Sequence, residues 1–360
     1  MKVAIDVQTT QGEKTGFGFY VENLVKNFAK FRDIDFELIK PKKSEDLNAP
    51  KRFLWDQFGF PGEALKNNAE IIHQPCFSAP VFHKNAKVIV TVHDLISTKF
   101  GIDLPFFARL YFKNWMPYTY KFADKIICDS ENTKRDVLEI LKVPENKIKV
   151  IYLAASDKFN NTVEKENTKK IKDKYNIGDK YFLEVGTLSP RKNIEFLIKV
   201  FSRISRDYPE YKLVLTGKKG WYYDKLTDLV KTRGIDDKVI FTGYIPDQDA
   251  PYLYKGAELF LYPSLYEGFG LPLLEAMASG VPVISSNASS LPEIVGDGGI
   301  LIDPSNEAGW IAAVKKVLDN QSLRRVMIQK GLKQAKKFSW KKCADETIKC
   351  YEELYDEENI

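Results

Sequence analysis

The chain has 360 residues, of which 44% are hydrophobic and 29% charged, so it is long enough for two domains with buried cores. Its formal net charge of +5 is too weak to indicate nucleic-acid binding, which needs a concentrated basic face, but it suits an anionic ligand or a membrane surface. Four cysteines without a Cys-x-x-Cys pair, together with three histidines, favour neither a disulfide framework nor a metal site.

These features predict a reduced cytosolic protein. The chain opens on residues 1–5, Met-Lys-Val-Ala-Ile, which begin a predicted strand rather than a signal peptide. No apolar run in the sequence reaches the length of a membrane span.

The first half of the chain predicts a doubly wound α/β domain. A short apolar strand at 3–7 is followed by a glycine loop with Gly16 and Gly18 and by an amphipathic helix at 21–28. Because the loop lacks the third glycine of the dinucleotide-binding fingerprint, a tight turn and a loop that approaches a ligand are both open. Further strands are expected at 36–39, 71–72, 88–92, 125–128 and 148–152, and helices at 105–122 and 130–141, the latter with Ser130 as its N-cap.

Two features of this half could serve function. His93, in Thr-Val-His-Asp-Leu at 91–95, follows a predicted buried strand, where ligands bind in such sheets; an ordinary hydrogen-bonded histidine is the alternative. The 105–122 helix combines aromatic residues with Arg109, Lys113 and Lys121, so contact with a membrane surface is one interpretation and a plain core helix the other.

A polar stretch at 156–174 is read as the domain boundary, after which the α/β alternation restarts. Strands are expected at 181–185, 212–215, 239–242, 259–262, 281–285 and 300–302, and helices at 194–206, 222–233, 272–279, 307–318 and 322–337. A last helix at 340–355 is left over once this second parallel sheet is complete.

Residues 266–275, Tyr-Glu-Gly-Phe-Gly-Leu-Pro-Leu-Leu-Glu, predict a glycine turn between a buried strand and a helix. Pro272 suits the first helical position and Gly280 the end of the helix. Glu267 is expected before the helix and Glu275 in its first turn. A helix N-terminus suits an anion, so two carboxylates beside it are best explained by hydroxyl donors such as those of a sugar. The plainer alternative is a solvated loop acid and a first-turn acid favoured by the dipole.

Arg191 and Lys192, in Ser-Pro-Arg-Lys-Asn at 189–193, lie between a predicted strand and a helix. Cations at a helix N-terminus oppose its dipole by about 0.3–1 kcal/mol each. An anionic ligand would remove that conflict, and both side chains can bind phosphate; the alternative is two solvated charges.

Three weaker patterns occur elsewhere in the sequence. Tyr244 and Ile245 follow a strand and could pack on a flat base, or simply form a turn. Residues 218–220, Lys-Lys-Gly, are a weaker phosphate candidate. The Asp-x-Asp pairs at 33–35 and 247–249 lack a third ligand nearby, so no metal site is predicted.

Together these residues resemble the retaining group 1 glycosyltransferases of the GT-B fold. The resemblance rests on Glu267 and Glu275 with seven residues between them, on 189–193 and 91–95, and on Phe-Ser-Trp at 338–340, where the last helix of the family crosses back to the first domain. It implies an α/β protein with two Rossmann-like domains facing across a cleft: 1–165 for the acceptor, 166–337 for the nucleotide sugar, and a returning helix at 338–360.

The resemblance also implies roles for single residues. Glu275 would hold ribose hydroxyls, Glu267 would hold hydroxyls of the transferred sugar, and Arg191 and Lys192 would neutralise the leaving diphosphate. The remaining positions are Gly268, Phe269, Gly270 and Leu271, whose backbone would bind sugar and diphosphate; Tyr244 and Ile245, bordering the base; His93, touching the sugar from the opposite domain; and Gly16 and Gly18, closing over the site. The chain departs from the family at 18–20, where related sequences often carry an arginine before the tyrosine.

The expected activity is therefore retaining hexosyl transfer from a nucleotide sugar, with no metal and no cofactor, in polysaccharide biosynthesis. GDP-mannose is the first choice of donor, because members with His-Asp-Leu resemble mannosyl enzymes; UDP-glucose is the alternative. The acceptor is expected to be a glycan or lipid-linked precursor. The protein is expected in the cytoplasm, and its peripheral contact with the inner face of the cell membrane stays open. A phosphorylase, for which no pyridoxal-binding lysine is evident, and a non-catalytic sugar-nucleotide-binding protein are the rival classes. The oligomeric state is not predicted.

Overall fold

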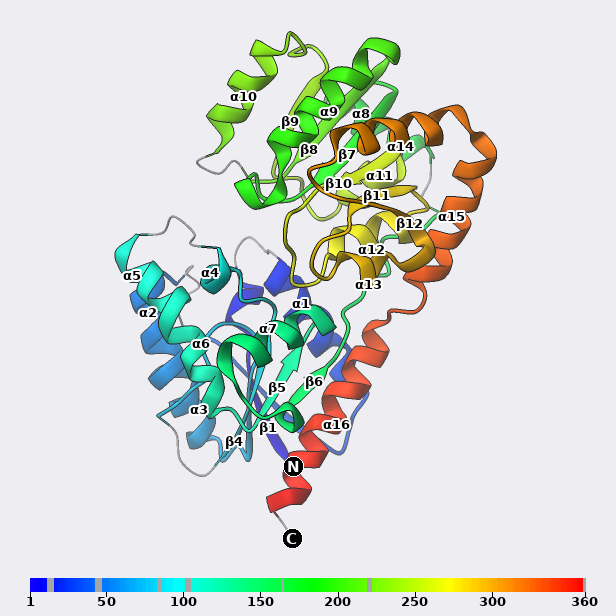
Figure 1. Cartoon of the computed structure of the whole chain (residues 1–360). Coiled ribbons are helices and arrows are strands. Elements are labelled where there is room, and N and C mark those ends of the chain that lie inside the picture. The colour runs from blue at the N-terminus through cyan, green and yellow to red at the C-terminus, as the bar shows by residue number, and fades with distance from the viewer. Residues whose placement is uncertain are drawn as a thin grey trace. The chain divides into compact units, whose positions relative to one another are not determined.

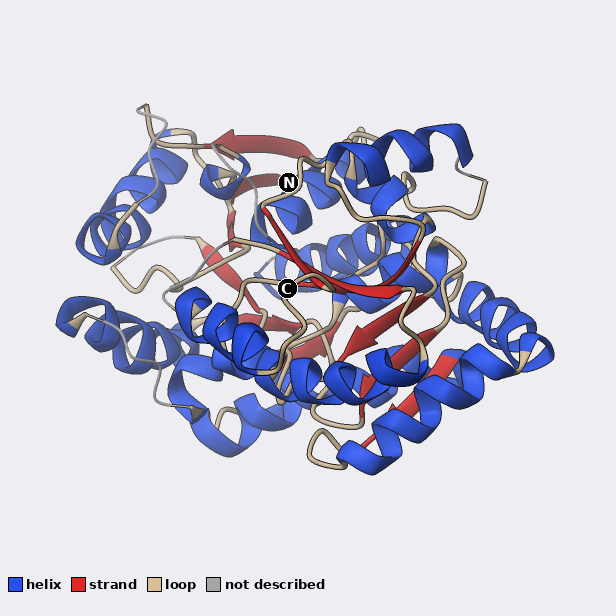
Figure 2. Cartoon of the chain, turned by 90° about the horizontal axis from the view of Figure 1, so that it is seen from above, coloured by secondary structure: helices blue, strands red, loops and turns tan. Residues whose placement is uncertain are grey.

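The computed structural model describes residues 1–11, 16–42, 47–82, 86–100, 105–162, 165–218 and 222–358. The chain forms two compact units: Met1–Leu153 with Ser339–Ile360, and Ala154–Phe338. In each unit helices cover a central sheet (Figures 1 and 2). None of the helices in the described part of the chain combines the length and the apolar character that a bilayer span requires.

Within the described residues, the first unit holds a six-stranded parallel sheet in the order β2-β1-β3-β4-β5-β6. The central strands are apolar and buried on both faces, as expected where helices cover both sides of a parallel sheet. The strands are β1 (Lys2–Asp6), β2 (Asp35–Ile39), β3 (Ile71–Gln74), β4 (Lys87–Val92), β5 (Lys125–Cys128) and β6 (Ile148–Val150).

Helix α1 (Gly16–Phe28) corrects one sequence prediction. The glycines at 16 and 18 lie in its first turn and not in a loop before it. Tyr20, Val21 and Leu24 are buried at helical spacing, so the apolar face of the helix starts earlier than the expected bound at residue 21. The segment from 12 to 15 lies outside the described residues.

The other helices of this unit differ from expectation at α4 (Ile96–Lys99), which was not predicted, and in the segments 105–122 and 49–66. The segment 105–122 is not one regular helix, because π-helical η3 (Leu110–Trp115) interrupts it. The region 49–66 is helical although no helix was predicted there, and it contains the second π-helical segment, η2 (Trp55–Gly59). The remaining helices are α2 (Ala49–Leu54), α3 (Phe60–Lys66), α4 (Ile96–Lys99), α5 (Phe106–Arg109), α6 (Met116–Thr119) and α7 (Glu131–Leu141), with short 3₁₀ turns η1 (Gln8–Thr10), η4 (Tyr120–Phe122) and η5 (Glu145–Lys147).

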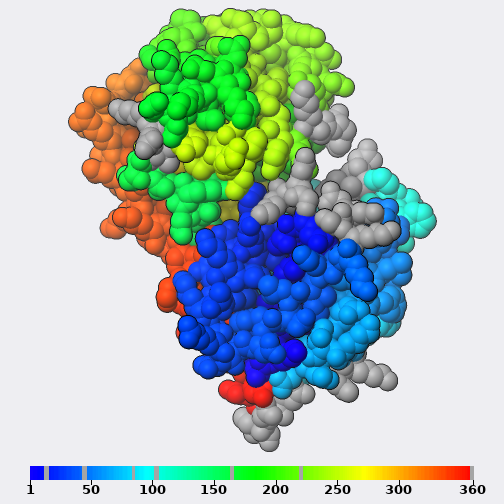
Figure 3. Space-filling model, turned by 180° about the vertical axis from the view of Figure 1, so that it is seen from behind, coloured from blue at the N-terminus to red at the C-terminus, as the bar shows by residue number. Residues whose placement is uncertain are grey.

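The last helix, α16 (Trp340–Glu358), returns to the first unit and packs on α1, as expected from the sequence. The space-filling view shows red C-terminal residues against the blue N-terminal ones (Figure 3). A buried contact holds α16 against the sheet, since Tyr351 Oη lies 2.6 Å from Nδ1 of His73 on β3. Thr91 Oγ1 lies 2.9 Å from the other ring nitrogen of His73. The helix is thereby tied to the middle of the sheet.

The second unit repeats the architecture, again counted over the described residues, with a six-stranded parallel sheet in the order β12-β11-β10-β7-β8-β9. All six strands correspond to predicted ones. They are β7 (Lys180–Val185), β8 (Tyr211–Thr216), β9 (Val239–Gly243), β10 (Leu259–Tyr262), β11 (Val283–Ser286) and β12 (Gly299–Ile302).

The predicted helices of this unit are present, and three more occur. Helix α8 (Lys165–Lys174) lies in the stretch read as a polar boundary, because its lysines and glutamate are good helix formers despite their polarity. The short helices α11 (Ala250–Lys255) and α13 (Leu291–Val295) were not predicted. The others are α9 (Ile194–Asp207), α10 (Tyr223–Thr232), α12 (Leu271–Ala278), α14 (Glu307–Asp319) and α15 (Gln321–Ala335), with 3₁₀ turns η6 (Pro190–Lys192) and η7 (Gly296–Gly298).

Candidate functional site

Arg191 and Lys192 lie in the 3₁₀ turn η6, between the carboxyl end of β7 and the start of α9. The turn is followed by Asn193 in the left-handed conformation, with φ of 57°. The Asn193 amide donates hydrogen bonds to the carbonyl oxygens of Pro263 (3.3 Å) and Pro304 (3.0 Å). The two cations are therefore held at the strand edge where ligands bind in parallel α/β sheets.

Glu267 forms ion pairs with both cations. Its Oε2 lies 2.5 Å from Arg191 Nη1, and its Oε1 lies 2.7 Å from Lys192 Nζ. The hydroxyls of Tyr262 (3.0 Å) and Ser264 (2.6 Å) donate to the same Oε1. The carboxylate expected to face sugar hydroxyls is thus paired with the predicted phosphate cations in this state of the protein.

The glycine turn is anchored by the loop that follows β11. Ser289 Oγ accepts a hydrogen bond from the Glu267 amide, and Ser290 Oγ donates to the carbonyls of Glu267 and Phe269. Gly270, the residue before α12, has a φ of 111°, and a Cβ there would lie 2.9 Å from the Leu291 side chain. Only glycine fits that position without strain.

Burial and charge act against each other at this site. Burial lowers the pKa of Lys192, while Glu267 acts to raise it. Burial raises the pKa of Glu267, but Lys192 and Arg191 outweigh it and bring the value to about 2. The Glu267 carboxylate therefore supplies, from within the protein, part of the negative charge that offsets the two cations beside a helix N-terminus.

Strand β7 contributes two residues that sequence reasoning missed. A Cβ at Gly186, directly after the strand, would lie 2.7 Å from Lys192 Cε and 2.9 Å from its Nζ, so the missing side chain leaves room for the lysine. Glu184 precedes it by two residues and shares its face of the strand. Glu184 is fully buried, and neither carboxyl oxygen has a hydrogen-bond partner among the described residues. Burial raises the pKa of Glu184 to about 8, against the opposing effect of Lys192.

Glu275 lies in the second turn of α12 and not in its first turn, because the helix starts at Leu271. The prediction of a first-turn acid was therefore wrong, because the helix begins one residue earlier than the expected start at Pro272. Its Oε2 accepts a hydrogen bond from Tyr254 Oη at 2.7 Å. Burial raises the pKa of Glu275 to about 7, although the Tyr254 hydrogen bond lowers it. This carboxyl can therefore change its charge near neutral pH.

The residues expected to border a base follow β9. The side chain of Tyr244 is 41% exposed, whereas Ile245 is buried and only 7% exposed. A polar pocket of about 850 Å³ lies beside them, and Pro246, Lys158 and Tyr252 contribute to its lining. Of the weaker phosphate candidate at 218–220, Lys219 and Gly220 lie outside the described residues.

The Asp-x-Asp pair at 247–249 has other partners than a metal. Asp247 pairs with Lys158, and Asp249 Oδ2 lies 2.6 Å from Lys174 Nζ and 2.7 Å from Tyr175 Oη. Over the residues that the structure covers, no group of three or more His, Cys, Asp or Glu side chains is arranged to hold a metal ion.

In the first unit, His93 follows β4 and Asp129 follows β5. The strand register pairs Val92 with Cys128, which brings the next two residues side by side. His93 Nδ1 lies 2.5 Å from Asp129 Oδ2, and Nε2 lies 2.9 Å from the Pro75 carbonyl oxygen. Because a carbonyl and a carboxylate only accept, this geometry favours protons on both ring nitrogens, and with them the imidazolium form of His93. Burial lowers its pKa, but Asp129 outweighs that effect and holds the pKa well above the ordinary value.

Two aromatic neighbours of His93 come from α1. The Phe17 ring stacks on the imidazole at 4.8 Å, and the Tyr20 ring meets it edge-on at the same distance. Gly16 and Gly18 bracket Phe17, and a Cβ at Gly16 would meet no atom within 4 Å. The structure thus brings the first-unit glycines and His93 into one neighbourhood, through Phe17.

Several site residues escaped the sequence analysis, although some left a signal. Tyr262, Ser264 and Asp129 all lie at or just past the carboxyl ends of parallel strands, the rule already applied to His93. Glu184 was detectable as an acid inside an otherwise apolar strand. The two serines at 289 and 290 had no sequence signal, because their role depends on the packing of two loops.

Comparison with known proteins gives two family matches and close structural likeness. The family profile described as Glycosyl transferases group 1 matches residues 166–334, and the one described as Glycosyltransferase Family 4 matches residues 16–156. The chain is 34% identical to O-antigen chain mannosyltransferase B of Escherichia coli over 308 residues, which cover 85% of this chain and 78% of that protein.

Among solved structures, sucrose-phosphate synthase of Thermosynechococcus elongatus is similar with a TM-score of 0.78 at 20% identity, over 99% of both chains. Anabaena HepE, solved with UDP and glucose, is similar with a TM-score of 0.75 at 16% identity, over 98% of this chain and 99% of that one. At such identities these likenesses establish the fold.

Proposed function

The chain belongs to the group 1 glycosyltransferases and has the GT-B fold, and on this premise we propose that it moves a mannosyl group from GDP-mannose to a glycan or lipid-linked acceptor, with retention of configuration. The observation that carries the proposal is the Arg191–Glu267–Lys192 cluster at the strand edge of the unit that the group 1 profile matches. The mannosyl choice is supported by the 34% identical relative, whose name is that of a mannosyltransferase.

The proposed donor contacts follow from charge. Arg191 and Lys192 with one ionised partner, Glu267, carry a net positive charge that suits a diphosphate. Glu184 adds nothing to this balance while it is protonated. When the diphosphate pairs with Arg191 and Lys192, Glu267 is released from them and can accept hydrogen bonds from the hydroxyls of the transferred sugar. Backbone groups of Gly268–Leu271 would complete the diphosphate site, Glu275 would hold the ribose, and Tyr244 and Ile245 would border the base.

The chemistry asked of these residues is stabilisation of a leaving diphosphate. Breaking the sugar–phosphate bond develops negative charge on the leaving group, and removal of one well-placed donor costs about 10²–10³-fold in rate. Arg191 and Lys192 can supply that charge without a metal ion. We assign no general base, because the leaving phosphate itself can take the proton of the acceptor hydroxyl. His93 is placed poorly for a base in any case, since both of its ring nitrogens already donate.

A donor screen tests the proposal. The purified chain is incubated with GDP-mannose, UDP-glucose and ADP-glucose, with and without EDTA, and the released nucleoside diphosphate is measured. Release of GDP that persists in EDTA supports the proposal, and turnover of a non-guanine sugar alone would overturn the donor assignment. UDP-glucose is the alternative donor, in keeping with the UDP and glucose bound by Anabaena HepE. Tight binding without any turnover would favour a non-catalytic sugar-nucleotide-binding protein.

A further inference from the structure

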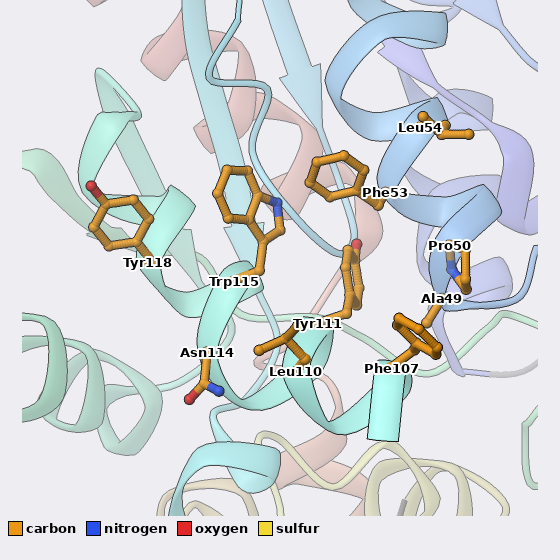
Figure 4. Close-up of a pocket in the computed structure, with 10 residues that line it drawn as sticks. All are labelled: Ala49, Pro50, Phe53, Leu54, Phe107, Leu110, Tyr111, Asn114, Trp115 and Tyr118. Carbon is orange, nitrogen blue, oxygen red and sulfur yellow. The ribbon is translucent and has the colours of Figure 1, made fainter. Parts of the chain in front are cut away.

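A pocket of about 870 Å³ lies in the first unit, and its lining includes neither His93 nor the glycines at 16 and 18. Figure 4 shows it between two helical segments, with Phe53, Leu54 and their neighbours from α2 on one side. Phe107, Leu110 and Trp115, from the segment 105–122, form the other side. Its volume falls in the range of about 300–1,000 Å³ typical of small-molecule sites.

The lining is almost entirely apolar. The Phe53 and Trp115 rings lie 5.2 Å apart, and the Tyr111 hydroxyl is turned to Asp56, with Oη 2.5 Å from Oδ2. Tyr111 therefore presents its ring to the pocket. Among the lining residues, the Asn114 side chain supplies an amide. Such a surface recognises hydrocarbon, because it offers few hydrogen bonds to a polar ligand.

The mouth of the pocket is also apolar. Leu54, Phe107 and Leu110 are 58%, 67% and 50% exposed, which places large hydrophobic side chains in contact with water. Adjacent apolar residues of this size, unlike scattered ones, mark a binding surface. Both π-helical segments of the unit, η2 and η3, adjoin or form this pocket, and such segments concentrate at functional sites.

The charged residues of the segment 105–122 have one sign. Arg109 and Lys113 are exposed next to lining residues in the chain. Between residues 105 and 123 the sequence contains no aspartate or glutamate. This combination of aromatic residues and cations complements an anionic amphiphile, whose chain needs an apolar slot and whose phosphate needs cations. The segment 105–122 therefore offers a protein partner no acidic group with which to pair its own cations.

We propose that this pocket binds the hydrocarbon chain of a phosphate-bearing lipid, the carrier of the acceptor, with its phosphate against Arg109 and Lys113. The inference rests on the proposed function for the identity of that lipid as the acceptor carrier. The binding itself needs neither donor nor transfer, so it is tested separately from the donor screen.

The test measures binding of hexadecyl phosphate, below its micelle concentration, to the full chain by titration calorimetry. Inorganic phosphate and phosphatidylglycerol vesicles are the comparison probes. Leu110→Gln makes the mouth polar with little change of volume, and Lys113→Gln removes a cation. Val326→Gln, on α15 of the other unit, is the matched control, because Val326 is 45% exposed and outside the pocket. Equal melting temperatures of the variants establish that each is folded.

We expect the wild-type chain to bind hexadecyl phosphate, Leu110→Gln to weaken binding about tenfold, and Val326→Gln to leave it unchanged. Lys113→Gln should weaken binding and reduce its salt dependence. Equal binding by Leu110→Gln and the wild type would overturn the proposal, as would competition by inorganic phosphate at similar concentration. Binding to vesicles without binding to monomeric hexadecyl phosphate would also overturn the proposal. That result would mean that the protein docks on a membrane surface and does not hold a hydrocarbon chain in this pocket. If the protein binds the lipid but releases no nucleoside diphosphate in the donor screen, that result would count against the proposed function alone.

Discussion

Glu267 Oε1 lies 2.7 Å from Lys192 Nζ, although the two residues are 75 positions apart in the sequence. The pair joins the turn after β7 to the glycine turn before α12, and Tyr262 and Ser264 complete it from the end of β10. A donor diphosphate would compete with Glu267 for the cation. The same carboxylate can therefore hold the site together before the donor binds and face the sugar afterwards.

Replacement of Lys192 by alanine should lower kcat by about 10²–10³-fold, because the leaving diphosphate loses one cation. The free energy of unfolding should fall less than for loss of an isolated buried ion pair, since Arg191 still pairs with Glu267. Steady-state kinetics and urea unfolding of the same preparation separate the two effects. An unchanged kcat with intact donor binding would remove the leaving-group role.

Gly186→Ala should impair turnover without removing any charged group. The new Cβ would lie 2.7 Å from Lys192 Cε, so the lysine side chain must shift from the position in which it pairs with Glu267. Displacement of a catalytic group by about 1 Å can cost on the order of 10²-fold in rate. Gly62→Ala in α3 is the control, because a Cβ there meets no atom within 4 Å. If Gly186→Ala and Gly62→Ala have the same kcat, the room left for Lys192 is not important.

Much of the fold was predictable because parallel strands buried on both faces leave short apolar runs. The six strands of the second unit correspond to predicted ones for this reason. The segments 49–66 and 105–122 were the difficult ones. Both contain π-helical turns, which shift the spacing of apolar residues away from that of a regular helix.

The site was predictable where a residue follows a strand or belongs to the glycine motif. Arg191, Lys192 and Glu267 became candidates in this way, but their mutual pairing was not predicted, because two loops 75 residues apart must pack before it exists. The imidazolium state of His93 was also beyond the sequence, since it depends on the Pro75 carbonyl and on Asp129.

Glu184→Gln should stabilise the protein increasingly as pH rises. The pKa of Glu184 is about 8 in the folded chain against an ordinary value of 4.5, so between these values only the folded state keeps the proton. The free energy of unfolding then falls with rising pH, by about 1.4 kcal/mol per pH unit for one group. Glutamine removes this loss. Urea unfolding at pH 5, 6.5 and 8 measures it, with exposed Glu139→Gln as the control. A difference from wild type that stays constant across these pH values would contradict the assignment.

The two described histidines should titrate at opposite ends of the pH scale. Burial, with the His93 charge, lowers the pKa of His73 to about 3, whereas Asp129 holds that of His93 well above its ordinary value. Nitrogen-15 NMR of the imidazoles should find His73 neutral at pH 5 and His93 still charged at pH 8. Asp129→Asn should bring the His93 titration down in pH. A neutral His93 at pH 7 in the wild type would refute the two-donor geometry.

The most direct test of the central claim is a crystal structure of the chain with GDP-mannose bound. We expect diphosphate oxygens within hydrogen-bond distance of Arg191 and Lys192, ribose hydroxyls at Glu275, and at least one oxygen of Glu267 turned from the cations to a mannose hydroxyl. A donor bound elsewhere, or one whose diphosphate leaves both Glu267 ion pairs intact, would contradict it.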